Sequence, residues 1–160
     1  MRILATAGGL AGALALTQFP EFSQQYVQRL SGAVDELRMV SVAFDASAKV
    51  AGMSREEAFD AMGEGTFQTS LRDDLRAHIT RYDRLNADYQ ALADADPLMR
   101  LARFYHIRDG ELVQRTWDDF RPAVPVTVDG LLFGGIGFAG GWLLVSLLLG
   151  ALMMPLRRFA

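Results

Sequence analysis

The sequence of 160 residues has no cysteine and only two histidines. The absence of cysteine excludes disulfide bonds, thiolate metal sites and cysteine nucleophiles. The net charge of −3 excludes a strongly basic nucleic-acid-binding protein. The sequence also lacks the phosphate-binding, dinucleotide-binding and serine-hydrolase fingerprints. We therefore expect no nucleic-acid partner, no small-molecule substrate and no cofactor.

Charge is missing from both ends of the chain. Among the 16 basic and 19 acidic side chains, only Arg2, Arg157 and Arg158 lie outside the segment from Glu21 to Asp129. Gly130 to Met154 is an uncharged run of 25 residues. About 20 helical residues cross the hydrocarbon core of a bilayer. We predict a transmembrane helix at 130–154, a proline-containing connector at 122–129 before it, and a tail at 155–160 after it.

The N-terminal apolar run, Ile3 to Phe19, has two interpretations. It could be a signal peptide with Arg2 as its basic region and Ala13-Leu14-Ala15 as its cleavage site. It could also be an uncleaved transmembrane helix near the short limit of the spanning range. We favour the uncleaved helix, at 1–19, because one arginine makes a weak basic region and no flexible segment follows Phe19.

Glycines form a stripe in each apolar segment. Steps of three and four residues place such glycines on one helix face, where they let membrane helices approach closely. The stripe could dock another membrane protein, or it could pack the two spans of one chain together. The glycines predicted to form this interface are Gly8, Gly12, Gly130, Gly134, Gly137 and Gly141.

The charged middle, 20–121, has helical periodicity. Apolar residues recur at steps of three and four over 22–50 and 66–93, which predicts two matched helices of about 42 Å each. The compact elbow between them predicts an antiparallel, coiled-coil-like hairpin, with short helices at 55–62, 97–108 and 111–120. The fold class is therefore all-α: two transmembrane helices flanking a helical hairpin. The predicted seam contains Leu30, Leu37, Phe44, Leu71, Leu75, Tyr82 and Leu85, together with Phe67 and His78.

Candidate catalytic and metal-ligating residues are few. His78 lies one helical turn after Asp74, and His106 lies near Asp109 and Glu111. Metal sites need three or four converging ligands, so packing or hydrogen bonding is the simpler role for each histidine. Charged pairs such as Arg84 and Asp88, one turn apart, predict a solvated face. We expect no catalytic residue and no metal site.

The arginines near the ends of the apolar segments predict the topology. Arg2, Arg157 and Arg158 lie outside the two spans. Basic residues flanking spans stay on the cytoplasmic side. We therefore expect both termini in the cytoplasm, residues 20–128 in the periplasm, and the protein in a bacterial inner membrane.

Two segments carry a family resemblance. FPEFSQQYVQRLSGAVDE (19–36) and DFRPAVPVTVDGLLFGGIGFAGGWLL (119–144) resemble a bacterial family named domain of unknown function 2937 (DUF2937). Members have an N-terminal apolar segment, a variable helical middle and a glycine-rich C-terminal span. The resemblance implies an integral inner-membrane protein with an uncleaved first span, and no catalytic residue can be transferred from it.

These observations predict a non-catalytic membrane protein. Glycine faces and a long seam are surfaces for contact with membrane lipid and with other protein subunits. The leading hypothesis is an accessory, scaffold or assembly subunit of an inner-membrane complex. The alternative is a homo-oligomeric envelope or sensor-like protein that assembles through its hairpin. A third hypothesis is an enzyme or metal-binding protein that uses His78 or His106.

Overall fold

The structure, a computed structural model, describes residues 2–122 and 127–153. Within these residues it is helical and has no strand, which confirms the all-α class. The predicted tail at 155–160 and residues 123–126 of the connector at 122–129 lie outside the described residues. The helices are α1 (Arg2–Thr17), α2 (Phe19–Val50), α3 (Arg55–Asp60), α4 (Thr66–Leu92), α5 (Pro97–Ala102), the 3₁₀ turn η1 (Phe104–His106), α6 (Gly110–Asp119) and α7 (Val128–Met153).

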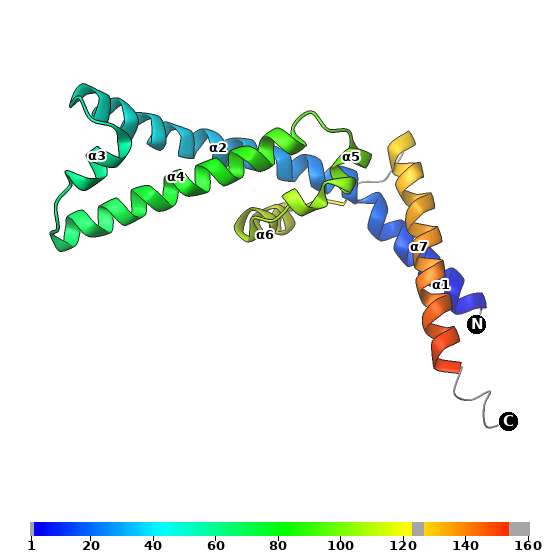
Figure 1. Cartoon of the computed structure of the whole chain (residues 1–160). Coiled ribbons are helices and arrows are strands. Elements are labelled where there is room, and N and C mark those ends of the chain that lie inside the picture. The colour runs from blue at the N-terminus through cyan, green and yellow to red at the C-terminus, as the bar shows by residue number, and fades with distance from the viewer. Residues whose placement is uncertain (1, 123–126, 154–160) are drawn as a thin grey trace. The chain divides into compact units, whose positions relative to one another are not determined.

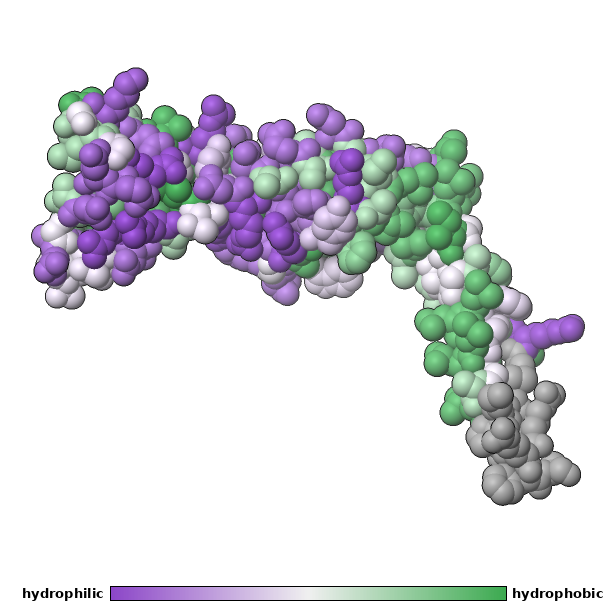
Figure 2. All heavy atoms as spheres, viewed as in Figure 1, coloured by the Kyte–Doolittle hydropathy of each residue, from purple (hydrophilic) through white to green (hydrophobic). Residues whose placement is uncertain are grey.

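The chain divides into two compact units. The membrane unit contains residues up to Gln25 and from Trp117 onward, and the helical unit contains Tyr26–Thr116. Two helical stretches, Arg2–Val50 and Val128–Leu152, are long and apolar enough to contain a membrane crossing. Figure 2 shows hydrophobic residues over α1 and α7 and mostly hydrophilic residues over the helical unit.

In the membrane unit, α1 packs along α7 (Figure 1). The packing continues into the start of α2, where the rings of Phe19 and Phe133 stack with centroids 5.7 Å apart. Phe133 is fully buried, although most apolar side chains of α7 are exposed. Exposed apolar side chains suit a helix surrounded by lipid.

A one-residue interruption at Gln18 separates α1 from α2. Pro20 follows it and has no backbone N–H to donate to the preceding turn. The helix resumes when the amide of Phe22 donates to the carbonyl of Gln18 at 3.0 Å. The break in the helix therefore lies two residues before the proline.

The core of the helical unit forms where α2, α4 and α6 meet. Its apolar side chains come from positions three, four and seven apart, as helical periodicity requires. The buried core residues are Tyr26, Val27, Leu30, Val34, Leu37, Leu85, Leu92 and Leu112. Tyr82 packs against this cluster from the side.

At the distal end of the helical unit, α3 lies between the end of α2 and the start of α4 (Figure 1). Gly52 ends α2 in a left-handed conformation (φ 73°), which glycine adopts without steric cost. Ser54 and Glu57 then form a capping box at the start of α3. Phe59 of α3 is buried and stacks on Phe44 of α2 with centroids 4.4 Å apart.

The predicted seam is wrong at this distal end. Leu71 is 39% exposed and Phe67 is 74% exposed. Both residues lie in the first turns of α4, where α3 and not α2 is the neighbouring helix (Figure 1). His78 is also exposed, and its neighbour Ile79 is buried instead. Leu75 and Phe44 are half-buried. The predicted residues Leu30, Leu37 and Leu85 are buried as expected.

Two arginines from the following turns cap α4. Arg100 donates to the carbonyls of Leu92 and Ala93, and Arg103 donates to that of Ala91. These carbonyls have no partner inside the helix, and cations are favourable at the negative end of its dipole. The predicted helix at 97–108 is therefore a short α5, begun by Asp96 and Pro97, followed by η1.

Candidate functional site

A buried carboxylate is the centre of the polar cluster in the helical unit. Asp88 of α4 is fully buried. One of its oxygens is 2.7 Å from His106 Nδ1, and the other accepts from Arg108 Nε at 2.9 Å. The neighbouring guanidinium stabilises the charge that burial would otherwise penalise, and the same contact raises the pKa of Arg108.

A second carboxylate, Asp109, completes this cluster. It is 5% exposed. Its side chain accepts from Arg81 at 3.3 Å and from Arg84 at 3.0 Å. Asp109 also accepts from the backbone amide of Leu112, which lies in the first turn of α6. Arg81 further donates to Glu111 at 2.8 Å. The cluster thus joins α4 to the turn before α6.

The hydroxyl of Tyr26 is buried beside these groups. No described atom makes a hydrogen bond of good geometry with it. Burial raises the pKa of Tyr26, and the nearby carboxylates of Asp109 and Asp88 raise it further. The backbone amides of Asp109 and Arg108 are close enough to offset part of the increase.

The cluster corrects one prediction. Asp88 does not belong to a solvated face with Arg84, since Asp88 is fully buried and Arg84 pairs with Asp109 instead. In the turn at 106–111, Asp109 and Glu111 form ion pairs with arginines. Within residues 2–122 and 127–153, no three histidine or acidic side chains are placed to hold a metal ion.

A signal in the sequence could have predicted the buried carboxylate. Asp88 lies three residues after Leu85 and four before Leu92, and both leucines are fully buried. Positions with this spacing share a helix face. A charged residue in an apolar stripe predicts a buried ion pair, and His106 and Arg108 were available in the segment between α5 and α6.

The predicted glycine interface brings α1 and α7 into contact. A Cβ built on Gly12 would lie 3.2 Å from the Cα of Gly141, and one built on Gly137 would lie 2.9 Å from the Cβ of Leu16. A Cβ on Gly8 would lie 3.0 Å from the Cβ of Val145. Side chains at these positions would force the helices apart. The glycine stripes of α1 and α7 therefore pack against each other within one chain.

The remaining predicted glycines lie near the start of α7. A Cβ on Gly134 would be 3.2 Å from Cγ2 of Thr17. Gly130 is buried, and its amide donates to the hydroxyl of Thr127 at 3.1 Å. By contrast, a Cβ on Gly135 or Gly140 would meet nothing within 4 Å. Neither position is in contact with α1.

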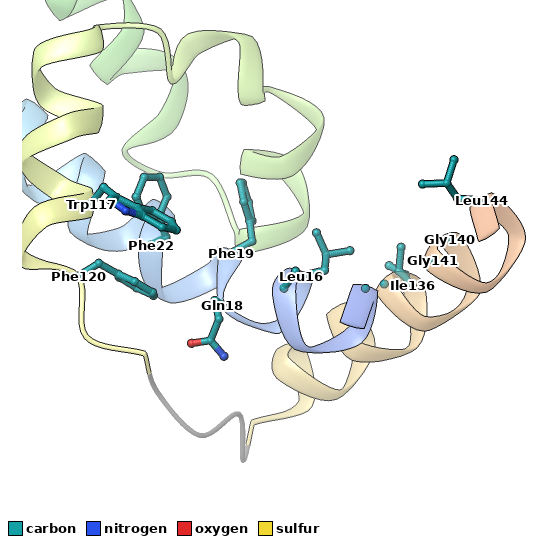
Figure 3. Close-up of a pocket in the computed structure, with 13 residues that line it drawn as sticks. Leu16, Gln18, Phe19, Phe22, Trp117, Phe120, Ile136, Gly140, Gly141 and Leu144 are labelled. Atoms are coloured by element: carbon teal, nitrogen blue, oxygen red, sulfur yellow. The ribbon is translucent and has the colours of Figure 1, made fainter. Parts of the chain in front are cut away.

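An apolar groove of about 580 Å³ follows the contact of α1 and α7 in the membrane unit. Figure 3 shows Leu16 and Phe19 on one side and Ile136 and Leu144 on the other. Gln18 contributes the one polar side chain besides the indole N–H of Trp117. The sequence did not predict this groove, because its walls are far apart in the chain.

The comparisons identify one family. The sequence model of the family described as "Protein of unknown function (DUF2937)" matches residues 1–158. No curated protein and no solved structure matches the chain.

Proposed function

We propose a non-catalytic role for this chain, which belongs to the DUF2937 family of proteins of unknown function. The membrane unit anchors the protein in a bacterial inner membrane, and the helical unit binds another protein subunit. The protein thereby serves as an accessory or scaffold subunit of a membrane complex. The distal end of the helical unit carries this proposal.

Large apolar side chains are exposed at that distal end. Val50 is 91% exposed and Phe67 is 74% exposed, on the two helices that α3 connects (Figure 1). Met53 and Leu71 are exposed near them. We call these four side chains the distal apolar residues. Exposed apolar residues on a charged surface mark contact sites for proteins, and methionine adapts well to a partner.

Other features support an adaptor over an enzyme. The buried carboxylates of the helical unit are paired with arginines of the same chain, which makes the cluster a structural clamp. The glycine stripe packs α1 against α7, so the two helices of the membrane unit need no other subunit to cover this face. The surface left for a partner is then the helical unit.

The test is purification of the full chain in mild detergent, followed by mass spectrometry of its partners. Phe67→Asp changes an exposed side chain, so the variant should fold and still lose the partner. Val42→Asp is the matched control, because Val42 is also exposed, at 55%, and lies outside the distal apolar residues. Retention of the same partners by Phe67→Asp would contradict the proposal.

A second function is favoured by the same residues. If Phe67 and Leu71 contact another copy of this chain, the protein is a homo-oligomer of the envelope or sensor-like kind. Light scattering of the detergent complex distinguishes the two functions. A single species that dissociates in Phe67→Asp supports the homo-oligomer, and loss of a foreign subunit supports the adaptor.

A further inference from the structure

The groove of the membrane unit is open to the side and lined almost entirely by apolar atoms. Its volume of about 580 Å³ is within the range of sites that hold one small ligand, about 300–1,000 Å³. Both helices that form its walls are the chain's candidate membrane spans. With the proposed membrane anchor, the medium around the groove is the hydrocarbon of the bilayer.

Glycine makes the groove narrow and smooth at one end. Gly137 and Gly141 hold the backbones of α1 and α7 together and form its floor. Gly140 lines the groove, and the space where its Cβ would be is empty. Leu16 and Leu144 form walls there. A slim, flexible apolar chain fits this shape, whereas another helix is about 10–12 Å across.

The other end of the groove is aromatic. Phe22 contacts Trp117 and Phe120 in edge-on geometry, with ring centroids 6.3 Å and 5.8 Å apart. Trp117 is 66% exposed. Tryptophan with its apolar ring and polar N–H is typical of the headgroup level of membranes. Charged residues follow immediately in the chain, from Asp118 to Arg121.

We propose that the groove binds one acyl chain of a bilayer phospholipid. The chain lies between Leu16 and Leu144 over the glycine floor, and the aromatic end meets the glycerol and headgroup region. The order of apolar groove, aromatic rings and charged residues matches the order of parts in a phospholipid. This inference is independent of the protein partner proposed for the distal apolar residues.

The experiment uses tryptophan fluorescence of the full chain in detergent. The chain has two tryptophans, Trp117 and Trp142, and Trp142→Phe leaves Trp117 at the groove as the one reporter. The probe is phosphatidylcholine brominated near the glycerol end of its acyl chains, the level proposed for Trp117, and it quenches tryptophan on contact. We expect quenching that saturates near one lipid per chain.

A Cβ on Gly140 would meet nothing within 4 Å, so Gly140→Leu adds its side chain to the groove. Gly135→Leu is the matched control, because Gly135 has the same open space and does not line the groove. We expect Gly140→Leu to weaken the saturable quenching at least tenfold and Gly135→Leu to leave it unchanged. Circular dichroism should show both variants folded. Linear quenching without saturation, or equal affinity in Gly140→Leu, would overturn the proposal. So would a dimer that Gly140→Leu dissociates, because a second copy would then be the occupant.

Discussion

Single side chains of the helical unit have roles that differ sharply within one helix. Asp88 and Asp74 both belong to α4, yet Asp88 is fully buried and Asp74 is exposed. Asp88 pairs with Arg108 and His106. A buried charge is tolerated only with such partners, so the two positions should respond differently to the same substitution.

We predict that Asp88→Ala lowers the free energy of unfolding by about 3 kcal/mol, since two charged hydrogen bonds and a buried side chain are lost. Asp74→Ala should change it by less than about 0.5 kcal/mol. Chemical denaturation of the full chain in detergent, followed by circular dichroism, measures both. Equal effects would mean that the buried cluster does not stabilise the helical unit.

Tyr26 predicts a loss of stability at alkaline pH. Burial raises the pKa of Tyr26 above the ordinary tyrosine value of 10.0, so the folded state holds the phenolic proton more tightly than the unfolded state. The stabilisation is complete below pH 10 and is lost as the pH rises through the folded pKa. Thermal denaturation between pH 8 and 11 should show this loss in wild type.

Tyr26→Phe removes the titrating hydroxyl. It should therefore remove the contribution of Tyr26 to the loss of stability at alkaline pH. It should also retain or increase stability at pH 7, because the hydroxyl has no partner of good geometry among the described residues. Tyr105→Phe, whose ring is 60% exposed, serves as the control and should leave the wild-type pH profile intact.

At the scale of elements, sequence periodicity predicted the helices well and their partners less well. The long helices begin and end within about three residues of expectation, because glycine and capping residues mark their ends. Periodicity identifies a face of a helix and not what covers it. The apolar faces of α2 and α4 therefore predicted one continuous seam, while Phe59 of α3 separates their distal turns.

The position of α3 can be tested with two matched substitutions. Phe59 is 1% exposed and Phe67 is 74% exposed. Phe59→Ala should cost about 3–4 kcal/mol and increase amide exchange in α3 and the end of α2. Phe67→Ala should cost less than about 0.5 kcal/mol. Similar exchange in the two variants would contradict the placement of α3 between the long helices.

The α1–α7 contact depends on glycine at positions where backbones meet. Gly137→Leu would place a side chain against the backbone of Gly12 and the side chain of Leu16. We expect the spans to separate, with faster proteolysis and a lower thermal transition in detergent. Gly135→Leu adds the same side chain in open space and should retain the wild-type transition. A matching transition in both variants would show that the stripe does not join the spans.

For the whole molecule, composition predicted the membrane unit and local patterns did not predict the sites. A long uncharged run predicts a candidate membrane span because a bilayer tolerates few charges. The groove combines Leu16 and Trp117 with Leu144, and the buried cluster combines Asp88 with Arg108. Such combinations depend on how distant helices pack, which no single stretch of sequence contains.

Topology is the prediction that belongs to the chain as a whole. Positive residues near spans remain cytoplasmic, and Arg2, Arg157 and Arg158 lie at the two ends of this sequence. A reporter active only in the periplasm should be active when fused after Gly110 and silent when fused after Ala160. The reverse pattern would contradict the orientation. Recovery of a mature chain beginning near Leu16 would instead show that the first apolar segment is a cleaved signal peptide.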